Sequence, residues 1–324
     1  MLITILMPFK NAAPWISETV DSILSQSFHD WELICIDDHS IDNGAEIIRT
    51  IDDSRIRVLE NSGDGIITAL QLGLSEAQGE YITRMDADDL MTPNRLELML
   101  EKMYDAKEKT IVTGKVKYIS EGELSEGFLK YEHWINERIE KNDYFDHIYR
   151  ECVVASPNWL ARREDLIQDR IFEDLHYPED YDMVFQWMKN HYSIKAVDEV
   201  TLLWRDHPNR TSKNSDVYNQ QALFRLKLDW FLQLNDLSTN SLAIFGAGTK
   251  GKITARYLQE HSVKFNWYDV NHSNYSTLDG IEIQNPENTT ESIVLICVYP
   301  DNREALENML ESKGYIIGKN AWYL

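Results

Sequence analysis

Short apolar runs alternate with helix-period segments along the first 115 residues, and this alternation constrains the fold more than any other feature of the sequence. The runs LITILMP, WELICIDD, RIRVLEN, EYITRMDADD and TIVTGKVKYI predict strands, and the segments between them place apolar residues at helical spacing. After the fourth run, Thr92 is expected to cap a helix that begins at Pro93. Strands that alternate with helices predict a parallel, doubly wound α/β sheet.

Polar residues follow each of the first four predicted strands. They are Pro8 to Asn11, Asp37 and Asp38, Asn61 to Asp64, and Asp86 to Asp89. In a doubly wound sheet, ligands bind beyond the carboxyl ends of the strands. We therefore expect these residues to meet at one edge of the sheet and to form a binding site there.

The composition changes along the remaining two thirds of the chain. Residues from about 120 to 178 are rich in aromatic and acidic side chains, and the run YEHWINERIEKNDYFDHIYREC is expected to be helical. A helical stretch from Asp216 to Leu234 precedes the polar run NDLSTNS, and a new strand begins at LAIFGAGTKGK. We therefore predict a large domain over 1–214, a helical linker over 215–240 and a smaller Rossmann-like α/β domain over 241–324.

The formal net charge of −22 argues against a nucleic-acid partner and against electrostatic binding to anionic lipid. An anionic ligand would need a metal ion or a local basic pocket. The three cysteines are odd in number and far apart, which is typical of a reducing cytoplasm. We also expect neither a signal peptide nor an integral membrane segment, because no uninterrupted apolar run approaches ~18 residues.

The acidic run after the fourth predicted strand is a candidate metal site. Residues two apart in a strand point the same way, so Asp86 and Asp88 are expected to project together. Mg²⁺ and similar hard cations prefer carboxylate oxygens and often share their coordination shell with substrate phosphates. The structural alternative is an aspartate-rich turn that caps the next helix.

Two further acidic pairs have a structural and a functional interpretation. Asp37 and Asp38 could form an Asx turn, or they could accept hydrogen bonds from a base and from ribose hydroxyls. Glu179 and Asp180 open a helix-period segment, YPEDYDMVFQWM. There they could complement the helix dipole, or one of them could act as a general base.

Six separated segments carry a resemblance to a known family. They are ILMPFKN, WELICIDDHSID, ALQLGLSEAQGEYITRMDADD, TPNRLE, PEDYDMVFQW and LLWRDHPNRTS. Their order and approximate spacing, over about residues 1 to 212, resemble those of bacterial family 2 glycosyltransferases. The resemblance implies a GT-A fold, which is the nucleotide-diphospho-sugar transferase fold, and an inverting transfer.

The resemblance also implies which residues bind the nucleotide. Pro8, Phe9 and Asn11 match the wall that holds the base. Asp38 matches the carboxylate that binds uracil or ribose, and Asp86 matches the first aspartate of the family's D-x-D motif, on the ribose side.

The metal and diphosphate positions follow from the same resemblance. Asp88 matches the metal ligand of the D-x-D motif, and His207 resembles the late histidine that completes the metal shell. A lone histidine is more often a surface or packed residue. Arg84, Arg205 and Arg210 could supply the positive charge that a diphosphate needs.

The reaction implied is a displacement at the anomeric carbon of a nucleotide-diphosphate sugar, with a UDP-sugar expected. Asp180 matches the catalytic base, which would take the proton of an acceptor hydroxyl, and Mn²⁺ or Mg²⁺ would assist departure of the diphosphate. The expected acceptor is a glycan or a lipid-linked glycan, in bacterial surface polysaccharide synthesis. The expected location is the cytoplasm, with peripheral association at the inner face of the membrane as a further option. Neither the donor sugar nor the oligomeric state follows from the sequence.

The run IFGAGTKGK supports a second interpretation. Gly246, Gly248 and Gly251 have the spacing of a dinucleotide or phosphate turn, and Asp269 ends the following strand. The glycines could equally serve packing alone. One alternative to a glycosyltransferase is therefore an NAD-dependent oxidoreductase centred on this turn. A second alternative is a non-catalytic protein that binds a nucleotide-sugar.

Overall fold

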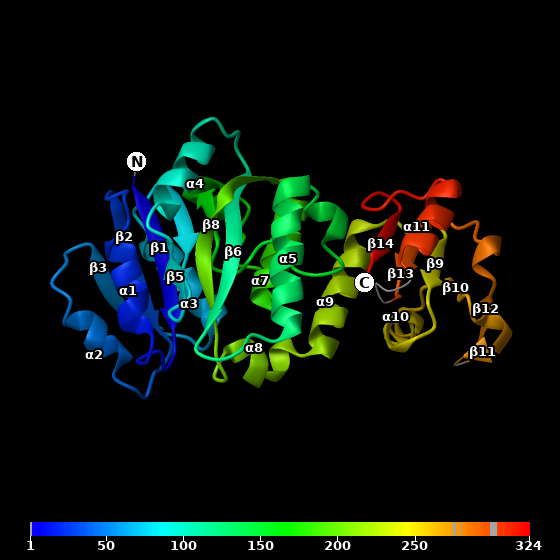
Figure 1. Cartoon of the computed structure of the whole chain (residues 1–324), viewed down its shortest axis with the longest axis horizontal. Coiled ribbons are helices and arrows are strands. Elements are labelled where there is room, and N and C mark those ends of the chain that lie inside the picture. Colours follow the sequence, from blue (N-terminus) through cyan, green and yellow to red (C-terminus); the bar gives the residue numbers. More distant parts are fainter. Residues whose placement is uncertain (1, 275–276, 279, 299–302) are drawn as a thin grey trace. The chain divides into compact units, whose positions relative to one another are not determined.

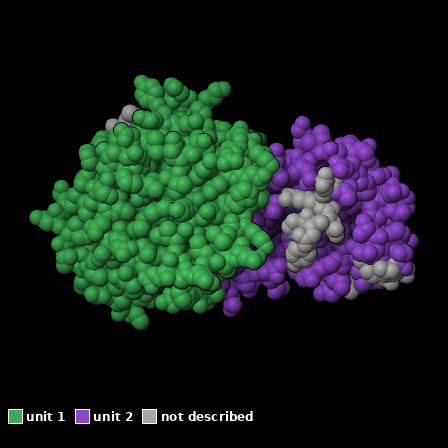
Figure 2. All heavy atoms as spheres, viewed as in Figure 1, with its two compact units in different colours: residues 1–144, 153–214 green, residues 145–152, 215–324 purple. Residues whose placement is uncertain are grey.

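The computed structural model describes residues 2–274, 277–278, 280–298 and 303–324. The chain divides into two compact units (Figure 2). Unit 1 comprises Met1–Tyr144 and Val153–Asn214, and unit 2 comprises Phe145–Cys152 and Ser215–Leu324. The stretch expected as a linker, 215–240, therefore lies in unit 2, as does the short segment 145–152.

Unit 1 contains an eight-stranded sheet in the order β3-β2-β1-β4-β7-β6-β8-β5. Figure 1 shows β3, β2 and β1 side by side. Its strands are β1 (Ile3–Phe9), β2 (Trp31–Asp37), β3 (Ile56–Glu60), β4 (Tyr81–Arg84), β5 (Leu90–Met91), β6 (Thr110–Ser120), β7 (Trp159–Arg162) and β8 (Ser193–Asp206).

The half of this sheet that contains β3, β2, β1 and β4 is parallel, as predicted. Every residue of β1 is buried, because helices cover both faces of such a sheet and exclude water from both. The fourth strand is shorter than predicted. It ends at Arg84, and the acidic residues 86–89 form a turn rather than the end of a strand. Strand alternation therefore does not explain the orientation of Asp86 and Asp88.

The other half of the sheet is mixed, because it includes strands that were not among those predicted in the first 115 residues. The strand β7 runs antiparallel to both β4 and β6, whereas β8 runs parallel to β6. The two-residue strand β5 pairs antiparallel with β8 directly after the acidic turn. This pairing brings the carboxyl-terminal part of β8 beside residues 86–89.

The helices of unit 1 are mostly those expected. They are α1 (Ile16–Leu24), α2 (Gly44–Arg49), α3 (Ile66–Glu76), α4 (Arg95–Tyr104), α5 (Glu126–Lys141), α6 (Arg163–Gln168), α7 (Glu179–Lys189) and α8 (Thr211–Asn214). Two details differ from the prediction. The N-cap of α4 is Asn94 rather than Thr92, whose hydroxyl instead donates to the backbone of Val200. The helix expected to reach Cys152 ends at Lys141 because Asn142 adopts a left-handed conformation, with φ of 52°.

Unit 2 contains a six-stranded sheet in the order β11-β12-β10-β9-β13-β14. Its strands are β9 (Leu242–Phe245), β10 (Asn266–Tyr268), β11 (Thr277–Leu278), β12 (Ile281–Gln284), β13 (Ile293–Ile296) and β14 (Ala321–Tyr323). Its helices are α9 (Gln220–Leu234), α10 (Thr249–Glu260) and α11 (Arg303–Ser312), with short 3₁₀ turns at Phe145–His147, Asp216–Tyr218, His272–Asn274 and Pro286–Asn288. All its strand pairs are parallel except β11 with β12.

No helix in the described part of the chain is both long enough and apolar enough to cross a bilayer.

Candidate active site

The carboxyl ends of the parallel strands bring the first group of predicted residues together. Phe9 is the register partner of Asp37, and Asp37 is the partner of Glu60, so β1, β2 and β3 end at the same level. Pro8 and Phe9 are buried within β1. Asn11 lies just beyond, in a left-handed conformation with φ of 53°, and its side-chain oxygen accepts a hydrogen bond from Ile41 N.

Asp38 organises the loop that precedes α3. Its Oδ1 accepts hydrogen bonds from Asn61 Nδ2 at 2.7 Å and from Gly65 N at 2.9 Å. Its Oδ2 lies 3.5 Å from Lys10 Nζ. Asp37 forms the turn that was the structural alternative, since its carboxylate accepts from Ser40 N. The two neighbouring acids therefore have different roles. Asp37 stabilises a local turn, whereas Asp38 connects the end of β2 to Asn61 after the end of β3.

Arg84, at the end of β4, is buried and bridges two acids. Its Nε donates to Asp86 Oδ1 at 2.8 Å and its Nη1 to Glu179 Oε1 at 3.1 Å. Burial raises the pKa of Asp86, the Arg84 guanidinium opposes this shift, and the Asp88 carboxylate adds to it. Arg84 thus links the acidic turn after β4 to the first turn of α7.

Asp88 contacts His207, as the family resemblance implies. The distance between Asp88 Oδ2 and His207 Nε2 is 2.8 Å. His207 follows the end of β8, and the β5–β8 pairing accounts for its approach to the turn. The His207 ring stacks on Trp15, with ring centroids 3.8 Å apart. Trp15 was not among the predicted site residues.

Asp180 lies in the first turn of α7, where its Oδ1 accepts a hydrogen bond from Tyr181 N at 2.8 Å. Burial raises the pKa of Asp180 to about 7, the adjacent Glu179 carboxylate adds to the shift, and Arg84 opposes it. The Asp86 carboxylate contributes a smaller increase. Asp180 and the acidic turn therefore influence each other electrostatically, and Asp180 is poised to exchange a proton near neutral pH.

The neighbouring arginines are largely engaged by protein groups. Arg205 donates to the Asp88 backbone oxygen at 2.7 Å and to Glu18 at 2.6 Å, and its own N–H donates to Asp89. Arg210 lies over the Trp204 ring, 5.2 Å from its centroid. Arg84 contacts the acidic side chains of Asp86 and Glu179 through its guanidinium, whereas Arg205 reaches the Asp89 carboxylate through its backbone N–H.

The chemistry of the acidic turn suits a divalent cation. Burial raises the pKa of Asp89 well above its usual range, and the Asp88 and Asp86 carboxylates raise it further. Negative charge is therefore crowded here. Asp88 Oδ2 and His207 Nε2 lie 2.8 Å apart, at hydrogen-bond distance, and are the two protein atoms that would be available to hold a cation here. Among the described residues, no group of three acidic, histidine or cysteine side chains could hold a metal ion.

Tyr177 connects the two sides of the site. A Cβ atom added to Gly65 would lie 2.5 Å from the Tyr177 hydroxyl, so the tyrosine sits against the N-terminus of α3. Burial and the charge of Glu179 raise the pKa of Tyr177, whereas hydrogen bonds from the backbone of Ile67 and Ile66 lower it. Asp38 also raises this pKa, so the Asp38 loop and the start of α7 both approach Tyr177.

The glycine-rich turn of unit 2 is tightly packed. Gly246 has φ of 99°, and a Cβ atom on Gly251 would lie 1.9 Å from the Gly246 oxygen. Asp269 Oδ2 accepts a hydrogen bond from Ala247 N at 2.6 Å, so the acid at the end of β10 stabilises the turn itself. A Cβ atom on Gly248 would meet nothing within 4 Å. Packing and the positive φ therefore explain Gly246 and Gly251, whereas Gly248 is the N-cap residue of α10, a position that favours glycine.

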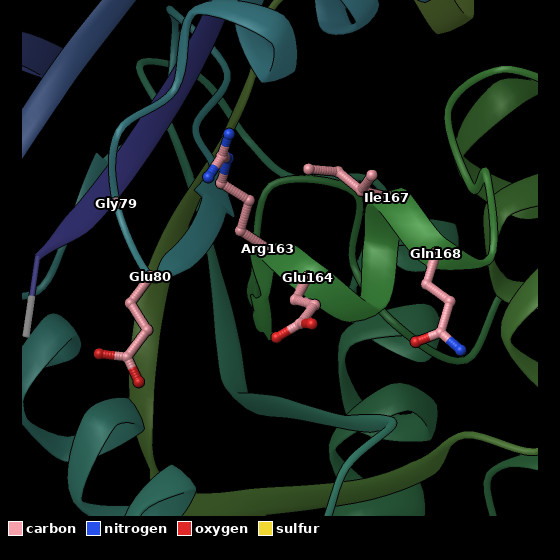
Figure 3. A pocket seen from close by; sticks show the side chains of 6 residues that line it. All are labelled: Gly79, Glu80, Arg163, Glu164, Ile167 and Gln168. Carbon is pink, nitrogen blue, oxygen red and sulfur yellow. The ribbon is translucent and has the colours of Figure 1, made fainter.

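A separate pocket lies at the opposite end of β4 (Figure 3). Its lining residues are Gly79, Glu80, Arg163, Glu164, Ile167 and Gln168. Because Gly79 and Glu80 precede β4 whereas the acidic turn follows it, this pocket is not part of the candidate site.

The residues that sequence reasoning missed are those that support predicted ones. In the sequence, Glu179 stands beside Asp180 as an alternative general base. In the structure it accepts a hydrogen bond from the buried Arg84 instead. Trp15 lies six residues after the buried Phe9, in a loop with no periodic pattern. Tyr177 had no signal beyond its proximity in sequence to Asp180.

Comparison with known proteins identifies a family. Residues 4–169 match the family described as glycosyl transferase family 2. Glycosyltransferase GlyG of Streptococcus pneumoniae is 30% identical over 183 residues, which is 54% of this chain and 60% of that protein. The UDP-Glc:alpha-D-GlcNAc-diphosphoundecaprenol beta-1,3-glucosyltransferase WfgD of Escherichia coli is 37% identical over 103 residues, 32% of this chain and 41% of that protein. The chain thus spans less than two thirds of either relative.

Solved structures support the same fold. The crystal structure of S. aureus TarS 1-349 in complex with UDP-GlcNAc matches with a TM-score of 0.55 at 16% identity, covering 72% of this chain and 67% of that one. The corresponding complex with UDP gives a TM-score of 0.51 at 18% identity, with 81% and 72% covered. The GT-A fold expected from the sequence is confirmed.

Proposed function

Because the chain belongs to glycosyl transferase family 2, we propose that it transfers a sugar from a nucleotide-diphosphate donor to a hydroxyl of a glycan or lipid-linked glycan. WfgD, by its name, uses a UDP-sugar and a diphosphoundecaprenol-linked acceptor, and this supports a UDP-sugar donor and a role in surface polysaccharide synthesis. A lipid-linked acceptor of this kind supports a location of the protein in the cytoplasm, at the inner face of the membrane.

The nucleotide is assigned to the ends of β1 and β2. Phe9 and Pro8 supply an apolar wall for the base, and Asn11 closes the strand end beside it. Asp38 holds the loop before α3 through Asn61 and Gly65, and its carboxylate is the acceptor for base or ribose groups. Asp86, held by Arg84, faces the ribose and the start of the diphosphate.

Asp88 and His207 would hold a Mn²⁺ or Mg²⁺ ion, which would screen the charge growing on the departing diphosphate. The chain's own part is to fix the two ligand atoms 2.8 Å apart. The carboxylates of the acidic turn repel one another, since each negative charge raises the pKa of its neighbours. A bound cation would reduce this repulsion.

Asp180 is the proposed general base. The acceptor oxygen forms a bond to the anomeric carbon as the bond from that carbon to the diphosphate oxygen breaks, and Asp180 takes the acceptor proton. The nucleoside diphosphate leaves with the bonding electron pair. Attack opposite to the leaving group inverts the anomeric configuration. A carboxyl with a pKa of about 7 is a better base than an ordinary aspartate and still ionises at neutral pH.

The observation that carries this proposal is the shared electrostatic environment of Asp180, Arg84 and Asp86 beside the Asp88–His207 pair. The test measures thermal stabilisation by UDP-, GDP- and dTDP-sugars with and without Mn²⁺, because ligands that bind the native state raise its stability. We expect Mn²⁺-dependent stabilisation by a UDP-sugar in the wild type and in Asp180→Asn, and its loss in Asp88→Asn.

Turnover is then assayed by release of UDP from the stabilising donor. Asp180→Asn should bind the donor but lose turnover by about 10²-fold or more. Donor binding without turnover in the wild type, with any glycan acceptor tested, would favour a non-catalytic nucleotide-sugar binding protein. No stabilisation by any nucleotide would contradict the proposal.

A further inference from the structure

The stacking of Trp15 on His207 is close and nearly parallel. Their ring centroids lie 3.8 Å apart and the ring planes are inclined by 26°. The His207 side chain is 9% exposed, so the indole covers one face of a largely buried imidazole. The two residues are 192 positions apart in sequence and come from the start of α1 and the end of β8.

The two ring nitrogens of His207 have different surroundings. Nε2 faces Asp88 Oδ2 at 2.8 Å, whereas Nδ1 is buried and has no hydrogen-bond partner among the described residues. Histidines that bind metal ions almost always donate their other N–H to a carboxylate, a carbonyl or water, and this bond fixes the ring orientation. Among the described residues, no protein group therefore orients the ring through Nδ1.

Trp15 is itself firmly placed. Its backbone N–H donates to the Ala12 backbone oxygen at 3.0 Å, and its backbone oxygen accepts from Thr19 N at 3.1 Å. It is the N-cap residue of α1, so its backbone is fixed by the buried helix that follows. An indole carried on a fixed backbone can restrict rotation of the imidazole that lies on it.

We infer that Trp15 is the positioning residue for His207, holding the imidazole by ring stacking so that Nε2 is directed at the cation that Asp88 would share. The inference rests on the proposed function, because it concerns the same metal site. The face of the indole ring has a negative electrostatic potential. It therefore also favours an imidazole ring that gains partial positive charge when that imidazole binds a cation. Trp15 touches no reacting atom in this arrangement.

The test uses Trp15→Leu, which removes the aromatic face, and Trp15→Phe, which keeps a smaller one. Trp15→Met replaces the leucine variant if that variant does not fold. Tyr104→Ala is the matched control, since Tyr104 is an aromatic residue 75% exposed at the end of α4. Two readouts are taken in the full-length chain: Mn²⁺ affinity in the presence of UDP, and the ring resonances of His207 in ¹³C-histidine-labelled protein, assigned by their loss in His207→Gln.

We expect the ring current of Trp15 to shift the His207 resonances upfield in the wild type, and this shift to vanish in Trp15→Leu. Mn²⁺ affinity should fall by about 10- to 100-fold in Trp15→Leu, as for loss of other groups that orient a metal ligand, and recover most of that loss in Trp15→Phe. Tyr104→Ala should match the wild type in both readouts.

Wild-type Mn²⁺ affinity in Trp15→Leu, or the absence of an upfield shift in the wild type, would overturn the inference and leave the proposed function intact. A wild-type chain that binds no Mn²⁺ with any nucleotide would instead overturn the proposed function, and the positioning role with it.

Discussion

Arg84 Nη1 donates a hydrogen bond to Glu179 Oε1 at 3.1 Å, and only 3% of Arg84 and 2% of Glu179 is exposed. The same guanidinium donates through Nε to Asp86. One arginine at the end of β4 therefore fixes the acidic turn and the first turn of α7 at once. Asp180 lies beside this pair, so its ionisation depends on both partners.

The first prediction concerns the opposite effects of the two partners on Asp180. Glu179→Gln removes a negative charge that raises the pKa of Asp180, so this pKa should fall from about 7. Arg84→Met removes a positive charge that lowers it, so the pKa should rise. Titration of ¹³C-labelled aspartate carboxyls, assigned with Asp180→Asn, measures both changes without any substrate. Shifts of the same sign in the two variants would contradict this account.

The second prediction is a pH dependence of stability. The pKa of Asp180 is raised from 3.8 to about 7 in the native state, so the native state holds its proton more firmly than the unfolded chain does. This contribution to stability is fully present below about pH 4 and is lost as the pH rises through 7. Asparagine cannot ionise.

The free energy of unfolding of Asp180→Asn should therefore increase relative to the wild type between pH 5 and pH 8. Urea denaturation at both pH values measures the change. The control is Asp21→Asn, because Asp21 is exposed on α1, and its difference from the wild type should not depend on pH. An equal difference for Asp180→Asn at the two pH values would show that Asp180 is not held protonated.

The third prediction concerns Gly65. Its φ of 85° and ψ of 172° lie in a region restricted essentially to glycine, which costs other residues about 1–3 kcal/mol, and an added Cβ atom would lie 2.5 Å from the Tyr177 hydroxyl. Gly65→Ala should lower the free energy of unfolding by at least that amount and weaken binding of the donor, since Gly65 N also donates to Asp38.

Tyr177→Phe in the Gly65→Ala background should restore part of the stability, because the hydroxyl that clashes is removed while the backbone strain persists. Urea denaturation and nucleotide-dependent stabilisation check the two effects. The contradicting outcome is additivity. If Tyr177→Phe lowers the free energy of unfolding equally in the wild type and in Gly65→Ala, the clash with the hydroxyl is not the cause of the destabilisation.

The fourth prediction separates packing from ligand binding in the glycine-rich turn of unit 2. Gly251→Ala would place a methyl group 1.9 Å from the Gly246 oxygen, so it should destabilise the protein by about 1–3 kcal/mol or more. Gly248→Ala meets nothing within 4 Å and should destabilise the protein less, by roughly 1 kcal/mol at most, through a weaker N-cap of α10.

Gly248→Ala is therefore the informative variant for the expected phosphate or dinucleotide site. If the turn binds such a ligand, thermal stabilisation by NAD or by a nucleoside diphosphate should be seen in the wild type and be reduced in Gly248→Ala. Equal stabilisation of both proteins would exclude Gly248 from the site.

The parallel half of unit 1 was predictable because each strand and helix there has its own local apolar period, and because parallel topology brings all carboxyl ends to one edge. The other half was not. The strand β7 has four residues with no alternation, β5 has two, and their partners lie far away in sequence. Such short segments gain their structure from the sheet that they join rather than from their own sequence.

The same distinction applies to the site. Asp38, Asp86 and Asp88 follow predicted strands, so their position could be inferred from local pattern. The Arg84–Glu179 bond joins residues 95 positions apart, and the sequence offers many acids for one arginine. The Trp15–His207 stack depends on how β5 pairs with β8, which no local signal indicated.

The segment Phe145–Cys152 belongs to unit 2 although it lies between two parts of unit 1 in sequence. Its Tyr149 makes edge-to-face contacts with Phe231 and Trp322, and both Ile148 and Tyr149 are completely buried. The polypeptide therefore passes between the units three times, and no single cut separates them. A chain truncated after Asn214 would lose Phe231 and Trp322, the aromatic partners of the buried Tyr149, so deleting the C-terminus does not yield unit 1 alone.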